Sequence, residues 1–291
     1  MKSNSILIVG CGDIGIRTGR LLLAAGWQVA GVRRNPQALP AEFTAYGADY
    51  TEPGSLDFIS DLKPDYVLAT FNPSERSLQG YRKGFVGGTD NLLRGLADHH
   101  PGHILSVSST RVLAESAGCW VDENSALAGK EDPRAMLIIE AEHRLLASPQ
   151  AVSVVRFAGI YGYPGGRLFS RIGRGELCAA QPPRYSNRIH RDDCAGILCH
   201  LLLVAVAGES LAPVYIGVDD QPALQFEVES WLAARLGIAQ PEYQQLSTSD
   251  ATIGKRCSNR LLHDSGYQLR YPDYRSGYQA VLEESAKVQA I

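Results

Sequence analysis

The chain contains 291 residues, of which 45% are hydrophobic and 20% are charged. This apolar content is enough for a sizeable core and excludes a disordered chain, while the length allows one large domain or two modest ones. The 28 Lys and Arg residues against 31 Asp and Glu residues give a net charge of −3. Such a balance provides no field for binding a phosphate backbone, so we expect no nucleic-acid partner.

Cysteine spacing and hydropathy indicate the compartment. The six cysteines are scattered and form no C-x-x-C pair, a pattern typical of reduced thiols and not of a disulfide framework or a zinc site. The longest apolar stretch, residues 196–208, is about 13 residues long, whereas about 20 are needed to span a bilayer. We therefore expect a cytoplasmic protein with no metal and no membrane partner.

Short apolar runs alternate with amphipathic helical segments through the first half of the chain. The runs predict buried strands at 6–9, 27–32, 66–70, 104–108 and 152–157. Helices are predicted at 13–25 and around 89–97, and a further helix is predicted to begin after Asp132, with Pro133 in its first turn. Strands that are continuously apolar, with helices between them, indicate a parallel sheet covered on both faces. The first half therefore predicts a doubly wound α/β domain, the Rossmann fold.

The second half has a looser pattern. Turn-rich stretches at 161–166 and 181–183 are typical of loops over a cleft. Beyond them we predict a buried helix at 192–206, a strand at 214–218 and an amphipathic helix at 226–236. Asp192 and Asp193 lie where they would cap the first of these helices. This part therefore predicts a smaller, discontinuous C-terminal domain that closes over the first.

Residues 10–15 form a G-x-G-x-x-G sequence, made of Gly10, Cys11, Gly12, Asp13, Ile14 and Gly15. It directly follows the first predicted strand and opens the first predicted helix, which is the context that a dinucleotide site needs. In such a site, the first glycine permits a tight turn, the second lets the backbone approach a pyrophosphate, and the third lets helix and strand pack closely. The helix N-terminus then presents free N–H groups to the phosphates. We interpret the loop as a dinucleotide site; the alternative is a glycine-rich turn without a ligand.

The end of the second predicted strand indicates which dinucleotide is bound. A site specific for NAD usually places Asp or Glu about 20 residues beyond the glycines, where the carboxylate accepts a hydrogen bond from the ribose 2′-hydroxyl. This chain has Arg33 and Arg34 there. Guanidinium groups can hold a 2′-phosphate, which a carboxylate would repel. The pair therefore favours NADP(H) as cofactor, with NAD(H) possible; the alternative is that both arginines are ordinary surface residues.

Beyond the glycine loop, four stretches carry a resemblance to a known family. They are residues 88–93, 106–110, 156–162 and 188–195. In this order and spacing the chain resembles the short-chain dehydrogenase/reductase superfamily over nearly its whole length, specifically the extended branch often labelled NAD-dependent epimerase/dehydratase. The resemblance implies a Rossmann fold with a small substrate domain.

The motifs predict a division of the chain into a cofactor-binding domain and a substrate-binding part. Residues 1–157, together with about 187–218, are predicted to form the dinucleotide-binding Rossmann domain. Residues 158–186 and 219–291 are predicted to form the substrate-binding or lid part.

The chain departs from this family at the residues that carry its chemistry. Val9 occupies the position of the first glycine of the branch's usual loop. The resemblance implies a proton relay by a tyrosine and a lysine in a Tyr-x-x-x-Lys helix. The positions expected for these two residues hold Arg134 and Ile138, or Asp132 and Met136 in a second register. Neither register supplies a phenol and an ammonium. The chain therefore resembles an atypical member that lacks the Tyr-x-x-x-Lys dyad.

Two hydroxyl groups are candidates for catalysis. Ser109 ends a predicted strand at the position that the resemblance assigns to the substrate-positioning hydroxyl. Tyr161, in the loop after a later strand, could replace the absent base or contact the substrate. The alternatives are that Ser109 only turns the end of the strand and that Tyr161 is a packed aromatic residue.

Further residues are candidates for binding. Phe71, Asn72 and Ser108 follow or end predicted strands and are expected to wall the cofactor. For the substrate, the candidates are Arg188, whose charge would suit an anion, His190 and Lys255. The alternatives are local hydrogen bonding for His190 and a solvated surface position for Lys255.

These features predict an NADP(H)-binding oxidoreductase or epimerase of the atypical extended short-chain type. Its substrate would be a small polar or sugar-derived metabolite. The alternative is a catalytically silent NAD(P)-binding sensor or regulatory protein. The missing dyad favours the silent protein, whereas Ser109 and the elaborate second domain favour the enzyme.

Overall fold

The computed structural model describes residues 3–115, 117–239 and 251–289. The chain divides into two compact units. Unit 1 comprises Met1–Val112, Ala126–Arg156 and Cys194–Tyr215, and unit 2 comprises Leu113–Ser125, Phe157–Asp193 and Ile216–Ile291. Of the predicted substrate-binding part, residues 240–250 and 290–291 lie outside the described residues.

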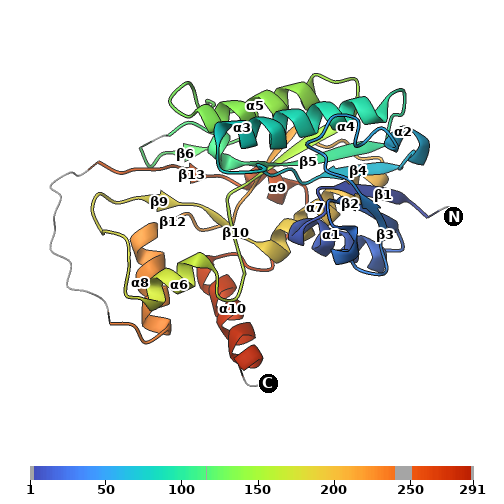
Figure 1. Ribbon diagram of the computed structural model, residues 1–291. Helices are drawn as coiled ribbons and strands as arrows, with labels where there is room; N and C mark the ends of the chain where they lie inside the picture. Colours follow the sequence, from blue (N-terminus) through green and yellow to red (C-terminus); the bar gives the residue numbers. More distant parts are fainter. Residues whose placement is uncertain (1–2, 116, 240–250, 290–291) are drawn as a thin grey trace. The chain divides into compact units, whose positions relative to one another are not determined.

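Unit 1 is built on a sheet of seven strands with the order β11-β7-β5-β4-β1-β2-β3 (Figure 1). The strands are β1 (Ser5–Val9), β2 (Gln28–Arg33), β3 (Thr44–Gly47), β4 (Tyr66–Ala69), β5 (His103–Ser109), β7 (Val152–Phe157) and β11 (Val214–Gly217). The pairs from β3 to β5 are all parallel. The strand order reverses between β1 and β4, which is the switch point at which doubly wound sheets bind ligands. The predicted doubly wound parallel sheet is confirmed.

Helices cover both faces of this sheet. Figure 1 shows α3, α4 and α5 over one face and α1 and α7 over the other. The helical elements of unit 1 are α1 (Asp13–Ala24), η1 (Pro36–Ala38), α2 (Ile59–Leu62), α3 (Leu78–Tyr81), the π-helical turn η2 (Arg82–Gly87), α4 (Gly88–Leu96), η3 (Thr110–Val112), α5 (Pro133–Leu146) and α7 (Arg191–Val206). The carboxylate of Asp132 accepts from the backbone N–H groups of Arg134 and Ala135, at 3.2 and 3.1 Å, which confirms the predicted cap of α5.

Unit 2 contains short strands together with helices, three of which share an apolar cluster. Its strands are β6 (Trp120–Val121), β8 (Gly159–Tyr161), β9 (Tyr185–Ser186), β10 (Arg188–His190), β12 (Ala223–Leu224) and β13 (Arg256–Cys257). Its helices are α6 (Arg167–Gly173), α8 (Gln225–Arg235), α9 (Arg260–Asp264) and α10 (Tyr274–Gln289). Side chains of α6, α8 and α10 bury one another in this cluster, among them Ile172, Leu232 and Tyr274, none of which is exposed.

The prediction that Asp192 and Asp193 cap a helix is wrong for Asp193. Its carboxylate accepts from the backbone N–H groups of Arg270 and Tyr271, at 2.7 and 3.0 Å, and from the hydroxyl of Tyr267 at 3.1 Å. Asp193 therefore anchors the segment before α10, and burial raises the pKa of its carboxyl. A contact across more than seventy residues leaves no trace in local sequence spacing.

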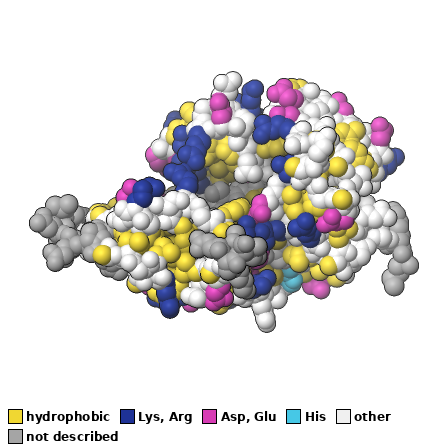
Figure 2. Space-filling view, turned by 60° about the horizontal axis from the view of Figure 1, so that its bottom comes forward, with side chains coloured by type: hydrophobic (Ala, Val, Ile, Leu, Met, Phe, Trp, Pro, Cys, Tyr) yellow, Lys and Arg dark blue, Asp and Glu magenta, His cyan; other side chains and the backbone are white. Residues whose placement is uncertain are grey.

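The described residues can be searched for membrane spans, metal sites, disulfides and basic surfaces. No helix among them is both long and apolar enough to cross a membrane, and no group of three or more potential metal ligands occurs among them. None of the six cysteines, all of which lie in the described ranges, forms a disulfide. On the face in Figure 2, Lys and Arg side chains lie among acidic and apolar ones and form no continuous basic surface.

Candidate functional sites

A cavity of about 310 Å³ lies in unit 1 beside the glycine loop. It is formed by the carboxyl ends of β1, β2 and β4 and by the segment that follows β3. Its walls consist of residues 10–12, 33–35, 48–51, Thr70 and residues 72–74. Six predicted cofactor residues therefore meet in one place, namely Gly10, Cys11, Gly12, Arg33, Arg34 and Asn72.

A side chain at each of the three glycines of the loop would meet different surroundings. Gly10 has a φ of +76°, and a Cβ there would lie 2.9 Å from the carbonyl oxygen of Thr70. A Cβ on Gly15 would lie 2.9 Å from Cγ2 of Ile8, so this glycine lets α1 pack on β1. A Cβ on Gly12 would meet nothing closer than 3.7 Å. The chain itself therefore requires glycine at positions 10 and 15 but not at position 12.

The N-terminus of α1 is open toward this cavity. Gly12 is the N-cap residue and provides no side-chain hydrogen bond to the first turn. Asp13 pairs with Arg17 at 3.2 Å on the helix surface, and Asp13, Ile14 and Gly15 are not among the residues that line the cavity. Gly12, the N-cap residue, lines the cavity, so the uncapped first turn of α1 begins at its edge. Uncapped N–H groups at a helix N-terminus suit an anion.

Arg33 and Arg34 supply the positive charge of the cavity. Within the described part of the chain, neither guanidinium forms an ion pair, and both line the cavity wall. Burial raises the pKa of the Cys11 thiol to about 12, although the Arg33 charge opposes this shift. Asp49 is the acidic residue of the wall, and its carboxylate accepts from the backbone N–H and the hydroxyl of Thr51, at 3.0 and 2.8 Å.

Phe71 packs against Tyr50, which is part of the cavity wall. Phe71 is buried, and its ring lies 4.9 Å from that of Tyr50. The Tyr50 hydroxyl donates to the carbonyl of Asn72 and accepts from its N–H, both at 3.0 Å. Asn72 thus lines the cavity while Phe71 packs beneath it. Sequence reasoning missed Asp49 and Tyr50 because the exposed strand before them, β3, has no apolar run.

Ser108 and Ser109 differ in what their hydroxyls contact. Ser108 is buried and donates to the carboxylate of Glu142, which also pairs with Arg156 at 2.7 Å. Its hydroxyl is therefore used inside the fold of unit 1. Ser109 is half-buried at the end of β5, and its Oγ accepts from the N–H of Arg111 at 3.2 Å. That contact leaves the Ser109 hydroxyl proton available to donate elsewhere.

The positions of the missing dyad hold residues of other kinds. Arg134 donates to the carbonyl of Arg76 at 2.8 Å and lies over the Tyr81 ring, 5.6 Å from its centre. Ile138 is buried in the core of unit 1. A guanidinium stays protonated at neutral pH and is no general base.

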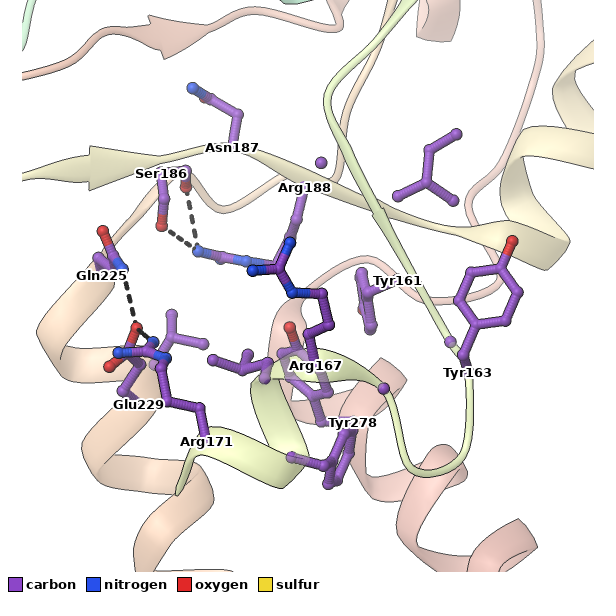
Figure 3. Close-up of a pocket in the computed structure, with 17 residues that line it drawn as sticks. Tyr161, Tyr163, Arg167, Arg171, Ser186, Asn187, Arg188, Gln225, Glu229 and Tyr278 are labelled. Carbon is purple, nitrogen blue, oxygen red and sulfur yellow. Dashed lines mark hydrogen bonds and ion pairs between the residues drawn. The ribbon is translucent and has the colours of Figure 1, made fainter. Parts of the chain in front are cut away.

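A second cavity, of about 590 Å³, lies within unit 2 (Figure 3). Its walls come from β8 and the loop after it, α6, β10, α8 and α10. Three arginines line it, namely Arg167, Arg171 and Arg188. Arg171 pairs with Glu229 of α8, which also accepts from the Gln225 side chain at 2.8 Å.

Tyr161 lies in the wall of this cavity but is largely packed. It is 8% exposed, and its ring lies 4.4 Å from that of Tyr278. Gly277 of α10 has no side chain, and a Cβ there would overlap the Tyr161 hydroxyl. Burial, reinforced by Asp219, raises the pKa of Tyr161. Its hydroxyl is therefore protonated at neutral pH and is not a ready base.

Of the three residues predicted to bind substrate, one lines the cavity. Arg188 is among the lining residues, whereas His190 and Lys255 are not. Nδ1 of His190 accepts from the backbone N–H of Asp192 at 3.2 Å. The ammonium of Lys255 donates to the backbone carbonyl of Leu113.

Asp219, which sequence reasoning missed, lies beside Arg188. Its backbone N–H donates to the Arg188 carbonyl at 2.8 Å. Burial raises the pKa of the carboxyl to about 7, while the Arg188 charge acts in the opposite direction. The only available sign was a pair of acidic residues directly after a predicted strand.

Known proteins resemble the chain over nearly its whole length. No protein-family model matches the sequence. A curated relative, protein YeeZ of Escherichia coli, is 25% identical over 278 residues, which cover 92% of this chain and 96% of the relative. A solved structure of a human epimerase family protein with NADPH has 21% identity and a TM-score of 0.70, covering 97% of this chain and 99% of the other. At 21% identity, this similarity shows a shared fold and nothing further.

A bacterial structure establishes the family. It comes from Methylobacillus flagellatus and is provisionally assigned as an NAD-dependent epimerase/dehydratase. It is 36% identical to this chain with a TM-score of 0.83, and the match covers 98% of this chain and all of the other. The chain therefore belongs to the NAD-dependent epimerase/dehydratase family.

Proposed function

We propose that the protein binds NADP(H) in the cavity of unit 1, with the 2′-phosphate on Arg33 and Arg34. The observation that carries this proposal is the presence of two guanidinium groups without ion-pair partners among the described residues, in the same cavity as the glycine loop. A phosphate is the ligand group that such a pair holds best. NAD(H) would bind the same cavity with fewer contacts.

The loop supports this proposal at the pyrophosphate as well. Gly12 leaves space that a Cβ would fill without touching the protein, and the first turn of α1 has no side-chain cap. Both features suit close approach of a pyrophosphate to the backbone. The human structure solved with NADPH shows that this fold accommodates the phosphorylated cofactor.

We further propose an oxidoreductase or epimerase reaction on a small polar or sugar-derived metabolite, with the cavity of unit 2 as its binding site. The nicotinamide, when bound, supplies hydride transfer. In unit 1, the hydroxyl proton of Ser109 is available for proton transfer, since its Oγ already accepts from Arg111. Tyr161 remains protonated and packs in the wall of the substrate cavity.

A silent cofactor-binding sensor is the second candidate. Arg134 and Ile138 favour it, because neither can take the place of a phenol or an ammonium in proton transfer. Incubation with NADPH and a panel of carbonyl metabolites, followed at the absorbance of reduced nicotinamide, separates the two. Turnover that falls in a Ser109→Ala variant supports the enzyme, and NADPH binding without turnover of any carbonyl supports the sensor.

Calorimetric titration with NADPH and NADH tests the cofactor proposal. We expect tighter binding of NADPH, and we expect Arg33→Ala with Arg34→Ala to weaken it by about 1–3 kcal/mol for each charged hydrogen bond lost. Affinity for NADH should hardly change. Arg20→Ala is the matched control, because Arg20 is an exposed arginine of unit 1 that pairs with Glu42 outside the cavity. Equal affinity for both cofactors would refute the assignment.

A further inference from the structure

In unit 2, the buried side chains of Arg188, Asp219 and Tyr161 each have polar atoms without a hydrogen-bond partner among the described residues. The unpaired atoms are Nη1 of Arg188, both carboxylate oxygens of Asp219 and the hydroxyl of Tyr161. Arg188 is 6% exposed and Asp219 is 1% exposed. A buried polar atom left unpaired costs about 1–3 kcal/mol, and more when it is charged. Arg188 and Tyr161 line the cavity, and Asp219 lies beside Arg188. Unpaired polar atoms at a cavity indicate a site in which a ligand supplies the missing partners.

The guanidinium of Arg188 is fixed in orientation. Its Nη2 donates to the backbone carbonyl of Ser186 at 3.1 Å and to the Ser186 hydroxyl, and its Cζ lies 5.5 Å from the centre of the Tyr274 ring. These contacts occupy one side of the guanidinium and leave Nη1 as a donor. Because its direction is already set, little side-chain entropy is lost when Nη1 binds an oxyanion.

Arg167 adds a second positive charge to the same cavity. It is the first residue of α6, is exposed, and forms no ion pair within the described part of the chain. Figure 3 shows the Arg167 and Arg188 side chains reaching into the cavity from α6 and β10. The charge of the third lining arginine, Arg171, is balanced by Glu229. The cavity therefore has more positive charge than its walls neutralise.

We propose that this cavity binds a small organic oxyanion, whose charged group lies between Arg188 and Arg167. Carboxylates and phosphate esters share the chemistry that these two guanidinium groups recognise. A cavity of about 590 Å³ is of the size that holds one small ligand. The inference rests on the proposed function only in taking this ligand as the substrate.

The surroundings of Asp219 make anion binding depend on pH. Burial favours the neutral acid, as do the charges of Asp220 and Asp273, whereas the charge of Arg188 and the nearby backbone N–H dipole of Gln221 favour the carboxylate. The phenols of Tyr161 and Tyr278 also face Asp219, and each is protonated at neutral pH because its pKa is raised.

The sign of the pH dependence follows from these groups. Burial has the largest effect, and the pKa of Asp219 is raised to about 7. Below that pH the acid is neutral and the charge of Arg188 is available to the ligand. Above it the carboxylate offsets Arg188 and repels an anion, so affinity falls as the pH rises.

Calorimetry on the full chain without any nucleotide tests the proposal. The probes are gluconate as the carboxylate, glucose 6-phosphate as the phosphate ester and glucose as the neutral control, at constant ionic strength. We expect at least one anion to bind and glucose not to bind. The affinity for gluconate, which keeps its charge in this range, should fall between pH 6 and pH 8, by at most about tenfold for each pH unit above 7, the limit for one proton.

One variant tests where the anion binds, and another tests whether Asp219 is the group that titrates. Arg167→Gln, at an exposed position, should weaken the anion at least about tenfold, the loss of one charge-assisted hydrogen bond, whereas Arg174→Gln should not. Arg174 is the matched control because it is exposed, follows α6 and pairs with Glu176 outside this cavity. Asp219→Asn should bind the anion equally at pH 6 and pH 8, with the affinity of the unchanged protein at pH 6.

Any one of four results would overturn the proposal. They are the absence of binding by both anions, equal binding of glucose, no effect of Arg167→Gln, or a pH dependence that persists in Asp219→Asn. Titration of the same samples with NADPH reports separately on the cavity of unit 1. If NADPH binds but neither anion does, the assignment of the cavity of unit 2 fails. If an anion binds but NADPH does not, the cofactor assignment fails.

Discussion

At the scale of single residues, the glycines after β1 separate folding from binding. Gly10 adopts a φ of +76° and faces the Thr70 carbonyl, so its lack of a side chain serves the fold. Gly12 has a φ of −92° and a ψ of −153°, an extended conformation that other residues adopt. The structure of the protein alone gives no reason for glycine at position 12. Close approach of a ligand to the backbone does give one.

Substitution of these two glycines should therefore have different effects. Gly12→Ala should change the free energy of unfolding by less than about 1 kcal/mol, the difference between Gly and Ala at an N-cap, and should weaken NADPH at least about tenfold because the methyl group occupies the space of the pyrophosphate. Gly10→Ala should destabilise the protein by about 1–2 kcal/mol or more, since alanine is strained at positive φ. Urea denaturation and calorimetric titration of both variants measure the two effects. Unchanged NADPH affinity in Gly12→Ala would contradict the assigned role of this loop.

At the scale of elements, one buried ion pair connects a helix of unit 1 to the sheet. Glu142 of α5 pairs with Arg156 of β7 at 2.7 Å and accepts from Ser108 of β5. The side chains of Glu142 and Arg156 are 3% and 5% exposed. Removing one partner of such a pair leaves a buried charge without compensation. The contact therefore fixes α5 against β5 directly before Ser109.

Glu142→Gln tests this connection with little change in volume. We expect a loss of about 3–5 kcal/mol in the free energy of unfolding, because Arg156 is left buried without a counter-charge. Glu140→Gln, on the same helix, is the control: its pairs with Arg82 and Arg144 are exposed, and exposed pairs contribute less than about 1 kcal/mol. Urea unfolding curves measure both. Equal stability of the two variants would show that the buried pair does not hold α5 in place.

At the scale of the whole molecule, the sequence predicts those elements whose signal is local. Strands such as β1 and β7 are buried apolar runs, and α5 has its cap and its proline side by side in the chain. The edge strand β3 is exposed or half-buried along its length, so it lacks an apolar run. The strands of unit 2 are two or three residues long and depend on partners far away in the chain.

The same distinction separates the predicted site residues from the missed ones. The glycine loop and the pair Arg33 and Arg34 follow recognisable strands, and the structure brings them to one cavity. Glu142 and Asp219 acquire their roles from Arg156 and Arg188, through contacts that local spacing does not encode. Ser108 was predicted to meet the cofactor from its position on β5, but its hydroxyl donates to Glu142. Side-chain direction at a strand end thus depends on the helix packed against it.

A crystal structure of the full chain with NADPH is the most direct test of the central claim, that the cavity beside the glycine loop binds the phosphorylated dinucleotide. We expect the pyrophosphate at the N–H groups of residues 12–15 and the 2′-phosphate oxygens within about 3 Å of the guanidinium groups of Arg33 and Arg34. An adenosine end bound away from both arginines, or a 2′-phosphate that faces solvent, would contradict it.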